Sequence, residues 1–225
     1  MFCNRAWLAS RATHQHLEEP MKILLIAAAT IAIATTAFAE TDTFDKASTG
    51  SLPTALTCGV TGRGQPKWTF EADSTAPSQP NVLKQSGSGT FPWCVWKGGS
   101  IADGYAEVKF KPLEGREDQA GGIVWRWKDG NNYYVGRANA LENNVSLYYT
   151  EKGRRITISY VDAPVARNQW HTLRVEFSGH DIKVLLDGKQ YIAQQDSHIS
   201  GAGAVGVWTK SDSVTAFDDF SFGGK

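Results

Sequence analysis

Aromatic, arginine and asparagine side chains gather in the middle of this 225-residue sequence. These residue types suit sugar recognition, because an aromatic ring offers a flat apolar surface to a pyranose. Arginine, asparagine and glutamate can form hydrogen bonds with its hydroxyl groups. The candidate ligand-binding residues are Trp125, Arg126, Tyr134, Arg137, Asn139, Asn144, Tyr148 and Trp208.

An alternative interpretation places the large aromatic residues in the hydrophobic core, where such side chains are common. Trp125 and Trp127 are two positions apart, so a regular strand directs both to one face. Burial of this pair is favoured over its exposure. Arg126 then takes the opposite face, beside Arg137 or Tyr134 according to the register.

Charged residues in the adjoining turns could support either structure or chemistry. Glu142 is a candidate partner for the two arginines, because a buried arginine needs one. A structural ion pair and a substrate clamp fit this pattern equally well. Lys210 and Asp212 follow Trp208 in a loop, from which they could reach a ligand, or they could be solvated loop charges.

Short alternating segments must position these side chains, and no long stretch has a helical period. Turn residues recur about every eight to twelve positions, which is typical of an antiparallel β-sandwich. The clearest segment directs Leu173, Val175 and Phe177 to one face, and Asp187-Gly188 predicts a hairpin turn. The expected strands are 105–110, 121–127, 133–139, 145–150, 154–161, 170–177, 182–186, 204–208 and 214–222, with another near Val82 in the loop-rich stretch 74–90.

The N-terminal region resembles an export signal. Residues 21–39 combine a basic start, an apolar run and an Ala37-Phe38-Ala39 exit, which predicts cleavage before Glu40 and a secreted or periplasmic protein. A retained anchor is the alternative, although the run is short of the ~20 apolar residues of a membrane span. Residues 1–20 are interpreted as a wrongly assigned extension and residues 40–225 as one domain, so we expect no membrane span in the mature chain.

Charge and cysteine content agree with this interpretation. The sequence has 23 basic and 23 acidic side chains, which gives no electrostatic reason to expect a nucleic-acid partner. Cys58 and Cys94 form an even pair in an oxidising compartment, so a disulfide is predicted. A metal-binding pair is disfavoured because no other Cys or His lies at ligand spacing, while two free thiols remain an alternative.

Several motifs in residues 104–222 resemble one known group of proteins. They include 121–126 (GGIVWR), 132–135 (NYYV), 137–144 (RANALENN), 170–173 (WHTL) and 207–220 (VWTKSDSVTAFDDF). They look like a bacterial branch of the concanavalin A-like superfamily, the laminin-G-like domains grouped with 3-keto-disaccharide hydrolases. The resemblance implies an all-β jelly-roll sandwich with carbohydrate as partner, either an oligosaccharide or a 3-keto-glycoside. Membership of such a fold does not itself make an enzyme.

Two functions are weighed, of which the resemblance implies the second. The first is a module that binds a saccharide, which rests on the fold, on the strands rich in aromatic, Arg and Asn residues, and on the absence of a paired-carboxylate motif. The second is hydrolysis of a 3-keto-disaccharide, in which one base removes the acidic C2 proton and a cation stabilises the oxyanion. Glu142 or Asp212 is the candidate base, with Lys210 or one of the arginines as the cation.

Other readings are weaker. Family-16 glucanases carry paired carboxylates on one strand for retaining hydrolysis, and this sequence has no such motif, so an ordinary retaining glucanase is not expected. A laminin-G-type protein-interaction module fits the fold but no particular residue. In related sandwiches an aspartate of the closing strand often helps bind a structural calcium ion, which makes Asp218 the candidate metal ligand.

Overall fold

The computed structural model describes residues 39–225, which form fifteen strands in one compact unit. The expected signal peptide and the extension before it lie outside the described residues, apart from Ala39. None of the described residues is helical, so this part of the chain holds no helix able to cross a membrane. The strands are β1 (Ala39–Asp42), β2 (Leu56–Gln65), β3 (Trp68–Ala72), β4 (Asn81–Gln85), β5 (Ser88–Ile101), β6 (Gly104–Glu114), β7 (Ala120–Asp129), β8 (Asn132–Asn139), β9 (Asn144–Glu151), β10 (Arg154–Asp162), β11 (His171–Ser178), β12 (Asp181–Leu186), β13 (Lys189–Gln195), β14 (Gly203–Trp208) and β15 (Val214–Gly224).

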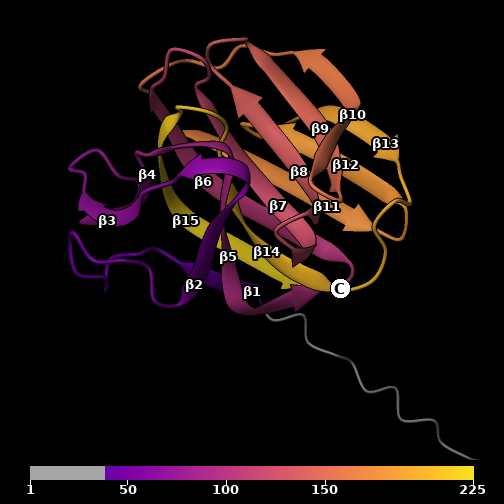
Figure 1. Ribbon diagram of the computed structural model, residues 1–225, viewed down its shortest axis with the longest axis horizontal. Coiled ribbons are helices and arrows are strands. Elements are labelled where there is room, and N and C mark those ends of the chain that lie inside the picture. Colours follow the sequence, from indigo (N-terminus) through magenta and orange to yellow (C-terminus); the bar gives the residue numbers. More distant parts are fainter. Residues whose placement is uncertain (1–38) are drawn as a thin grey trace, which may run out of the picture. The chain divides into compact units, whose positions relative to one another are not determined.

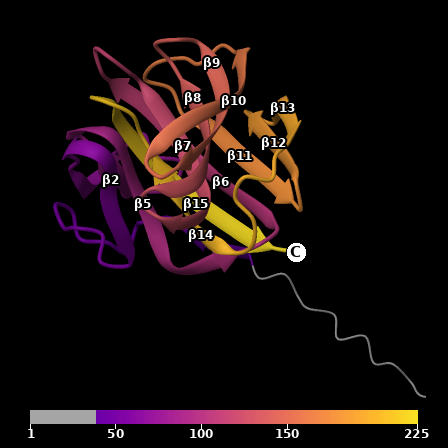
Figure 2. The same ribbon diagram turned by 45° about the vertical axis from the view of Figure 1, so that its right-hand side comes forward.

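Two antiparallel sheets pack face to face, which confirms the predicted β-sandwich. Sheet A has the order β13-β12-β11-β6-β15-β4-β3, with β1 paired to β15. Sheet B has the order β10-β9-β8-β7-β14-β5-β2. In Figure 1, β3 and β4 lie at the left, at the opposite end of sheet A from β12 and β13. Figure 2 shows β7, β8 and β9 side by side in sheet B.

Sheet A alternates between buried and accessible side chains, as the sequence predicted. Leu173, Val175 and Phe177 of β11 are buried, and the residues between them are partly exposed. The hairpin from β12 to β13 turns at Asp187 and Gly188, whose φ angles of 51° and 77° are those of a tight two-residue turn. Glycine and aspartate tolerate this backbone conformation better than bulkier residues, so the Asp-Gly signal was sufficient to place the turn.

The central strands of sheet B are buried on both faces. Its inner face packs against sheet A through residues such as Ile123 and Leu147. Its outer face carries a second apolar cluster, formed by Trp93, Val95, Ala120, Val124, Tyr133, Val135, Tyr148 and Trp208 with Phe91, Trp127 and Ala204 at its border. Aromatic residues therefore occupy both faces of this sheet.

A bulge in β7 separates Trp125 from Trp127 and corrects the prediction that both lie on one face. The pairing of β7 with β8 shifts register after Trp125, and Arg126 has a φ angle of 45°. An extra residue in a strand reverses the alternation beyond it. Trp125 consequently lies in the core between the sheets, where it stacks on Tyr134 and Phe177, whereas Trp127 belongs to the outer face of sheet B.

The disulfide between Cys58 and Cys94 is confirmed. The two residues are direct cross-strand partners in β2 and β5, with their Cα atoms 4.0 Å apart. The bond ties β2, the edge strand of sheet B, to its neighbour. The sequence did not predict β1, β2, β3 or β5; β5 in particular contains Pro92 and two adjacent glycines, so it lacks a regular alternation.

The bulge predicts that two tryptophan substitutions lower the free energy of unfolding by different amounts. Trp125→Ala should lower the free energy of unfolding by about 3–5 kcal/mol, because it opens a cavity in a fully buried core. Trp127→Ala should cost clearly less, because its side chain is partly exposed. Denaturant unfolding of the two variants measures the difference, and equal losses would contradict the placement of the two rings on opposite faces.

Candidate functional site

Four charged residues meet at one end of the outer face of sheet B, and we call them the charged cluster. Arg137 projects from β8 and Glu142 from the turn between β8 and β9. Asp118 lies just before β7, and Lys210 just after β14. Because β7 lies between β8 and β14 in sheet B, strands distant in sequence bring these side chains together.

Two cations bridge two carboxylates in this cluster. Arg137 places its guanidinium 3.6 Å from Asp118 and 2.5 Å from Glu142. Lys210 forms an ion pair with Asp118 and lies 4.0 Å from Glu142. The side chains of Asp118 and Arg137 are 0% and 1% exposed, whereas those of Glu142 and Lys210 are 35% and 24% exposed. The cluster therefore has a buried base and a solvent-facing rim.

Two asparagines add hydrogen bonds to the side chains of the charged cluster. The Asn139 amide donates to Asp118, and its carbonyl oxygen accepts from the backbone of the turn that carries Glu142. Asn144 accepts from Arg137 at 2.8 Å and donates to Glu142 at 2.8 Å. The cluster is thus held by side chains whose own positions are fixed, a requirement for a preorganised site.

The two carboxylates differ in their protonation chemistry. Burial raises the pKa of Asp118 above its ordinary value, although the hydrogen bond from Lys210 and the charge of Arg137 oppose this. Burial also acts on Glu142, but the Asn144 amide and the Arg137 guanidinium outweigh it and lower the pKa of this carboxyl. Glu142 is therefore ionised at neutral pH. Within residues 39–225 its Oε1 atom accepts no hydrogen bond, because both hydrogen bonds go to Oε2.

Aromatic rings lie beside the charged cluster on the same face. Phe91 stacks on Trp208 with a centroid separation of 5.7 Å, and Trp93 contacts Trp127 at 5.1 Å. Phe91 and Trp127 are partly exposed, whereas Trp208 is fully buried. Tyr148 links these aromatic rings to the charged cluster, since the Arg137 guanidinium lies 5.6 Å from its ring centroid.

Most of the candidate residues come together here, although their roles remain predictions. The outer face of sheet B brings Arg137, Asn139, Asn144, Tyr148 and Trp208 next to Glu142 and Lys210. Trp125 and Tyr134 lie instead in the core between the sheets. Arg126 is buried at the end of the sandwich, where it donates to the backbone oxygens of Ala102, Ile199 and Gly179 and pairs with Asp103.

Asp212 forms no ion pair with the charged residues of the cluster among the described residues. Its carboxylate accepts hydrogen bonds from the backbone amides of Arg116, Glu117 and Asp118, at 2.7, 3.0 and 3.1 Å. These bonds lower its pKa against the effect of burial. Asp212 therefore anchors the loop that positions Asp118, and its oxygens are already engaged by the protein.

Three residues of this region were not singled out from the sequence. Asp118 lies in an expected loop, and Phe91 lies in a strand that was not predicted. Arg155 of β10 pairs in register with Thr150 of β9, so it shares the outer face with Tyr148. The period-two pattern of residues 154–161, aligned with that of β9, could have located Arg155.

Asp218 is held by hydrogen bonds within the protein. Its two carboxylate oxygens accept hydrogen bonds from the backbone and hydroxyl of Ser78, both at 2.9 Å, and from the backbone of Asp219 at 2.8 Å. In the part of the chain that the structure describes, no group of three or more acidic, His or Cys side chains could hold a metal ion. A calcium ion bound by Asp218 with backbone carbonyls stays a prediction.

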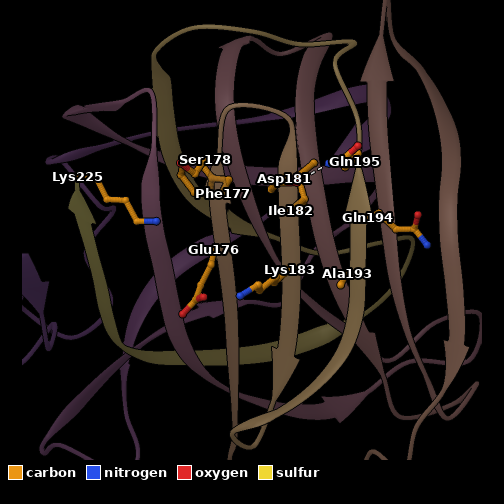
Figure 3. A pocket seen from close by; sticks show the side chains of 10 residues that line it. All are labelled: Glu176, Phe177, Ser178, Asp181, Ile182, Lys183, Ala193, Gln194, Gln195 and Lys225. Carbon is orange, nitrogen blue, oxygen red and sulfur yellow. Dashed lines mark hydrogen bonds between the residues drawn. The ribbon is translucent and has the colours of Figure 1, made fainter.

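A wide hollow of about 740 Å³ lies elsewhere, on sheet A near the C-terminus. Figure 3 shows Glu176 of β11 beside Lys183 of β12, and the hydrogen bond between Asp181 and Gln195. None of its lining side chains has a buried polar atom without a partner. This hollow has no fixed arrangement of binding groups comparable to that on sheet B.

Comparisons with known proteins establish the fold. No family model matches the chain, and no curated protein sequence matches it. A carbohydrate-binding module of Bacillus subtilis, CBM66, is similar in structure, with 20% identity, coverage of 71% of this chain and 94% of that chain, and a TM-score of 0.59. The β-glucanase of Bacillus licheniformis shows 13% identity, coverage of 85% and 99%, and a TM-score of 0.56. The cellulose-induced protein Cip1 shows 15% identity, coverage of 81% and 96%, and a TM-score of 0.56.

These likenesses confirm the predicted jelly-roll sandwich of the type found in glucanases and carbohydrate-binding modules. The identities are too low to carry an activity from those proteins to this chain. The narrower resemblance to 3-keto-disaccharide hydrolase domains remains a prediction.

The charged cluster predicts a pH-dependent contribution to stability. Glu142→Gln should lower the free energy of unfolding at pH 7 by about 0.5–1 kcal/mol, as for other partly exposed ion pairs. Because the folded-state pKa of Glu142 lies below its ordinary value of 4.5, this contribution is present above that pH and disappears as the pH falls through the folded-state pKa. Unfolding curves of both proteins from pH 7 to pH 3 test this. A difference that stays constant over this range would contradict it.

Proposed function

We propose that this protein binds a saccharide on the outer face of sheet B. The observation that carries the proposal is the meeting, on one face, of partly exposed aromatic rings with a fixed set of charged and amide groups. Neither a third sheet nor a helix covers this face within residues 39–225. Aromatic surface with a few positioned polar groups is the usual composition of a small-molecule site.

The accessible groups match the apolar C–H surface and the polar hydroxyl groups of a sugar. Phe91 and Trp127 supply ring surface for C–H groups, while Glu142 and Lys210 supply an acceptor and a donor for hydroxyls. The printed names of similar structures, a carbohydrate-binding module and a β-glucanase, agree with a sugar ligand. The Cys58–Cys94 disulfide is typical of exported proteins, which supports the proposed secreted or periplasmic location.

A protein-interaction role of the laminin-G type has no comparable support. The exposed large hydrophobic residues of the described chain are Leu52, Leu141, Ile156 and Tyr160. They come from a loop, a turn and the two faces of β10, so they do not suggest an extended apolar patch. Large exposed apolar patches are what commonly mark protein-interaction surfaces.

Substitutions on the two sheets should separate a binding face from a general surface effect. Phe91→Ala should weaken saccharide affinity about 5- to 10-fold, because it removes the exposed ring of the stack on Trp208. Glu142→Gln should weaken it through loss of the charged acceptor. Isothermal titration against a panel of neutral and acidic oligosaccharides measures both effects.

Sheet A provides a matched control. Tyr105 lies 4.0 Å from the guanidinium carbon of Arg174, which also pairs with Glu107 at 3.3 Å. Tyr105→Ala and Glu107→Gln thus remove a similar ring and carboxylate from the other sheet, and both should leave affinity unchanged. Equal losses on both sheets, or loss on sheet A alone, would refute the proposed face.

Hydrolysis of a 3-keto-disaccharide is the second candidate, and the free Oε1 atom of Glu142 favours it. As base, Glu142 would take the C2 proton, and the electron pair of that C–H bond would form a C1–C2 double bond. The glycosidic oxygen would leave C1 with its bonding pair and take up a proton from water, and Glu142 would return its own proton to the solvent. Water added across that bond completes net hydrolysis. Lys210, 4.0 Å from Glu142, is the cation available for the oxyanion.

Incubation with a 3-keto-disaccharide and its unoxidised parent tests this second candidate. Hydrolysis predicts that monosaccharide appears from the keto sugar alone, and that Glu142→Gln reduces the rate at least 100-fold, the usual contribution of a general base. Asp212→Asn provides the comparison, because that carboxylate already binds three backbone amides. Undiminished turnover in Glu142→Gln would exclude Glu142 as the base, and no turnover in the native protein would leave binding alone.

A further inference from the structure

Arg155 is a cation for which residues 39–225 provide no anionic partner. Its guanidinium carbon lies 4.2 Å from the ring centroid of Tyr148, 4.6 Å from that of Phe91 and 5.7 Å from that of Trp208. The salt bridges of residues 39–225 do not include it. Its NH1 atom is buried and has no hydrogen-bond partner.

The charges on this face of sheet B do not sum to zero. Arg137 and Lys210 offset Asp118 and Glu142, so Arg155 is the surplus positive charge. Burial lowers the pKa of Arg155, which reflects a cation that its surroundings stabilise poorly. An arginine nevertheless stays protonated in proteins, so the charge persists. Arg155 is only partly buried, but its NH1 atom is shielded from solvent, and a buried donor normally has a partner.

Three further N–H groups of the same face have no acceptor within residues 39–225. They are Arg137 Nε and the indole nitrogens of Trp93 and Trp127. Arg137 and Trp93 are at least nine-tenths buried. Asp118 Oδ2 also lacks a hydrogen bond, but it is ion-paired with Lys210, and the other groups named are all donors. A ligand rich in acceptors, and above all an anion, would correct this shortage.

We propose that the saccharide bound on the outer face of sheet B carries an anionic group, a carboxylate or a sulfate ester, that pairs with Arg155. This inference rests on the proposed binding function and specifies its ligand class. Part of the Arg155 side chain is exposed, so an anion can approach it from solvent. The flanking rings of Phe91 and Tyr148 would hold the guanidinium in place and strengthen a charge-assisted contact by excluding water.

A substitution next to Arg155 tests the pairing without removing a buried side chain. Thr157 is exposed and lies on the same face of β10, because it pairs in register with Tyr148. Thr157→Glu places a carboxylate beside Arg155, and Thr157→Gln is its uncharged control. The titrants are an oligogalacturonate and its carboxyl-reduced form, and a sulfated galactan fragment and its desulfated form.

The native protein should bind at least one anionic sugar about tenfold more tightly than its neutral counterpart, and added salt should reduce this preference. Thr157→Glu should abolish the preference, and Thr157→Gln should keep it. Arg155→Gln should also abolish it, with near-ultraviolet circular dichroism to confirm folding. Which of the two anionic sugars is preferred distinguishes a uronate from a sulfate ligand.

Two results would overturn the assignment. Equal affinity for anionic and neutral sugars would refute an anionic ligand while leaving saccharide binding intact. A preference that survives both Thr157→Glu and Arg155→Gln would place the anion away from Arg155. Absence of binding to every sugar is a different result, because it would also remove the proposed function on which this inference rests.

Discussion

Burial of the central strands of sheet B on both faces is the constraint on which the rest of the structure depends. Sheet A covers the inner face, and the side chains of the sheet itself cover most of the outer face. Every residue of β9 except the last is buried, yet Asn144, Ser146 and Thr150 are polar. Polar groups in such a position need partners, because an unsatisfied buried group costs about 1–3 kcal/mol. The hydrogen bonds of the charged cluster supply such partners to Asn144 and Ser146.

The charged cluster therefore has a structural role beside the binding role proposed for it. Removal of Asp118 or Arg137, its two fully buried members, would leave a buried charge with less compensation, which is more destabilising than the loss of a partly exposed member such as Glu142. The position of Asp118 depends in turn on Asp212, whose carboxylate binds the backbone of the loop that carries Asp118. A site built in this way is rigid at its base, and its adjustable groups are at the rim, where Glu142 and Lys210 meet solvent. Rigid bases of this kind reduce the ordering cost of ligand binding.

Within the strands that it predicted, the sequence assigned the faces of side chains better in sheet A than in sheet B, for a physical reason. In sheet A one face of each strand meets the core and the other meets solvent, so β6, β11 and β12 alternate and can be identified residue by residue. In sheet B the alternation in β8 and β9 separates two buried faces, so it predicts the strands but not which face is inner. The bulge at Arg126 then reverses the alternation of side chains within β7, and the local residue types do not predict this bulge.

The candidate site was predictable to the extent that it depends on local sequence. Arg137, Glu142 and Asn144 lie within eight residues of one another, on a hairpin whose turn the sequence indicates. Asp118, Phe91 and Arg155 join them through sheet order, which requires knowledge of how β14, β5 and β10 are arranged. The misplaced candidates have other causes. Trp125 and Tyr134 suit sugar binding by residue type, but the inner face of sheet B needed large rings to fill the sandwich. Arg126 lies at the bulge of β7, where its guanidinium donates to backbone oxygens.

The physical state of Glu142 bears directly on the choice between binding and catalysis. A base must be ionised and must reach the proton that it removes. Glu142 meets the first condition, but its Oε2 atom is committed to Arg137 and Asn144 at 2.5 and 2.8 Å. This arrangement lowers the basicity of the carboxylate, since a base is weaker when cations stabilise its charged form. The same contacts hold Oε1 in a fixed direction, which benefits a hydrogen-bond acceptor more than a base. The geometry therefore supports saccharide binding ahead of hydrolysis.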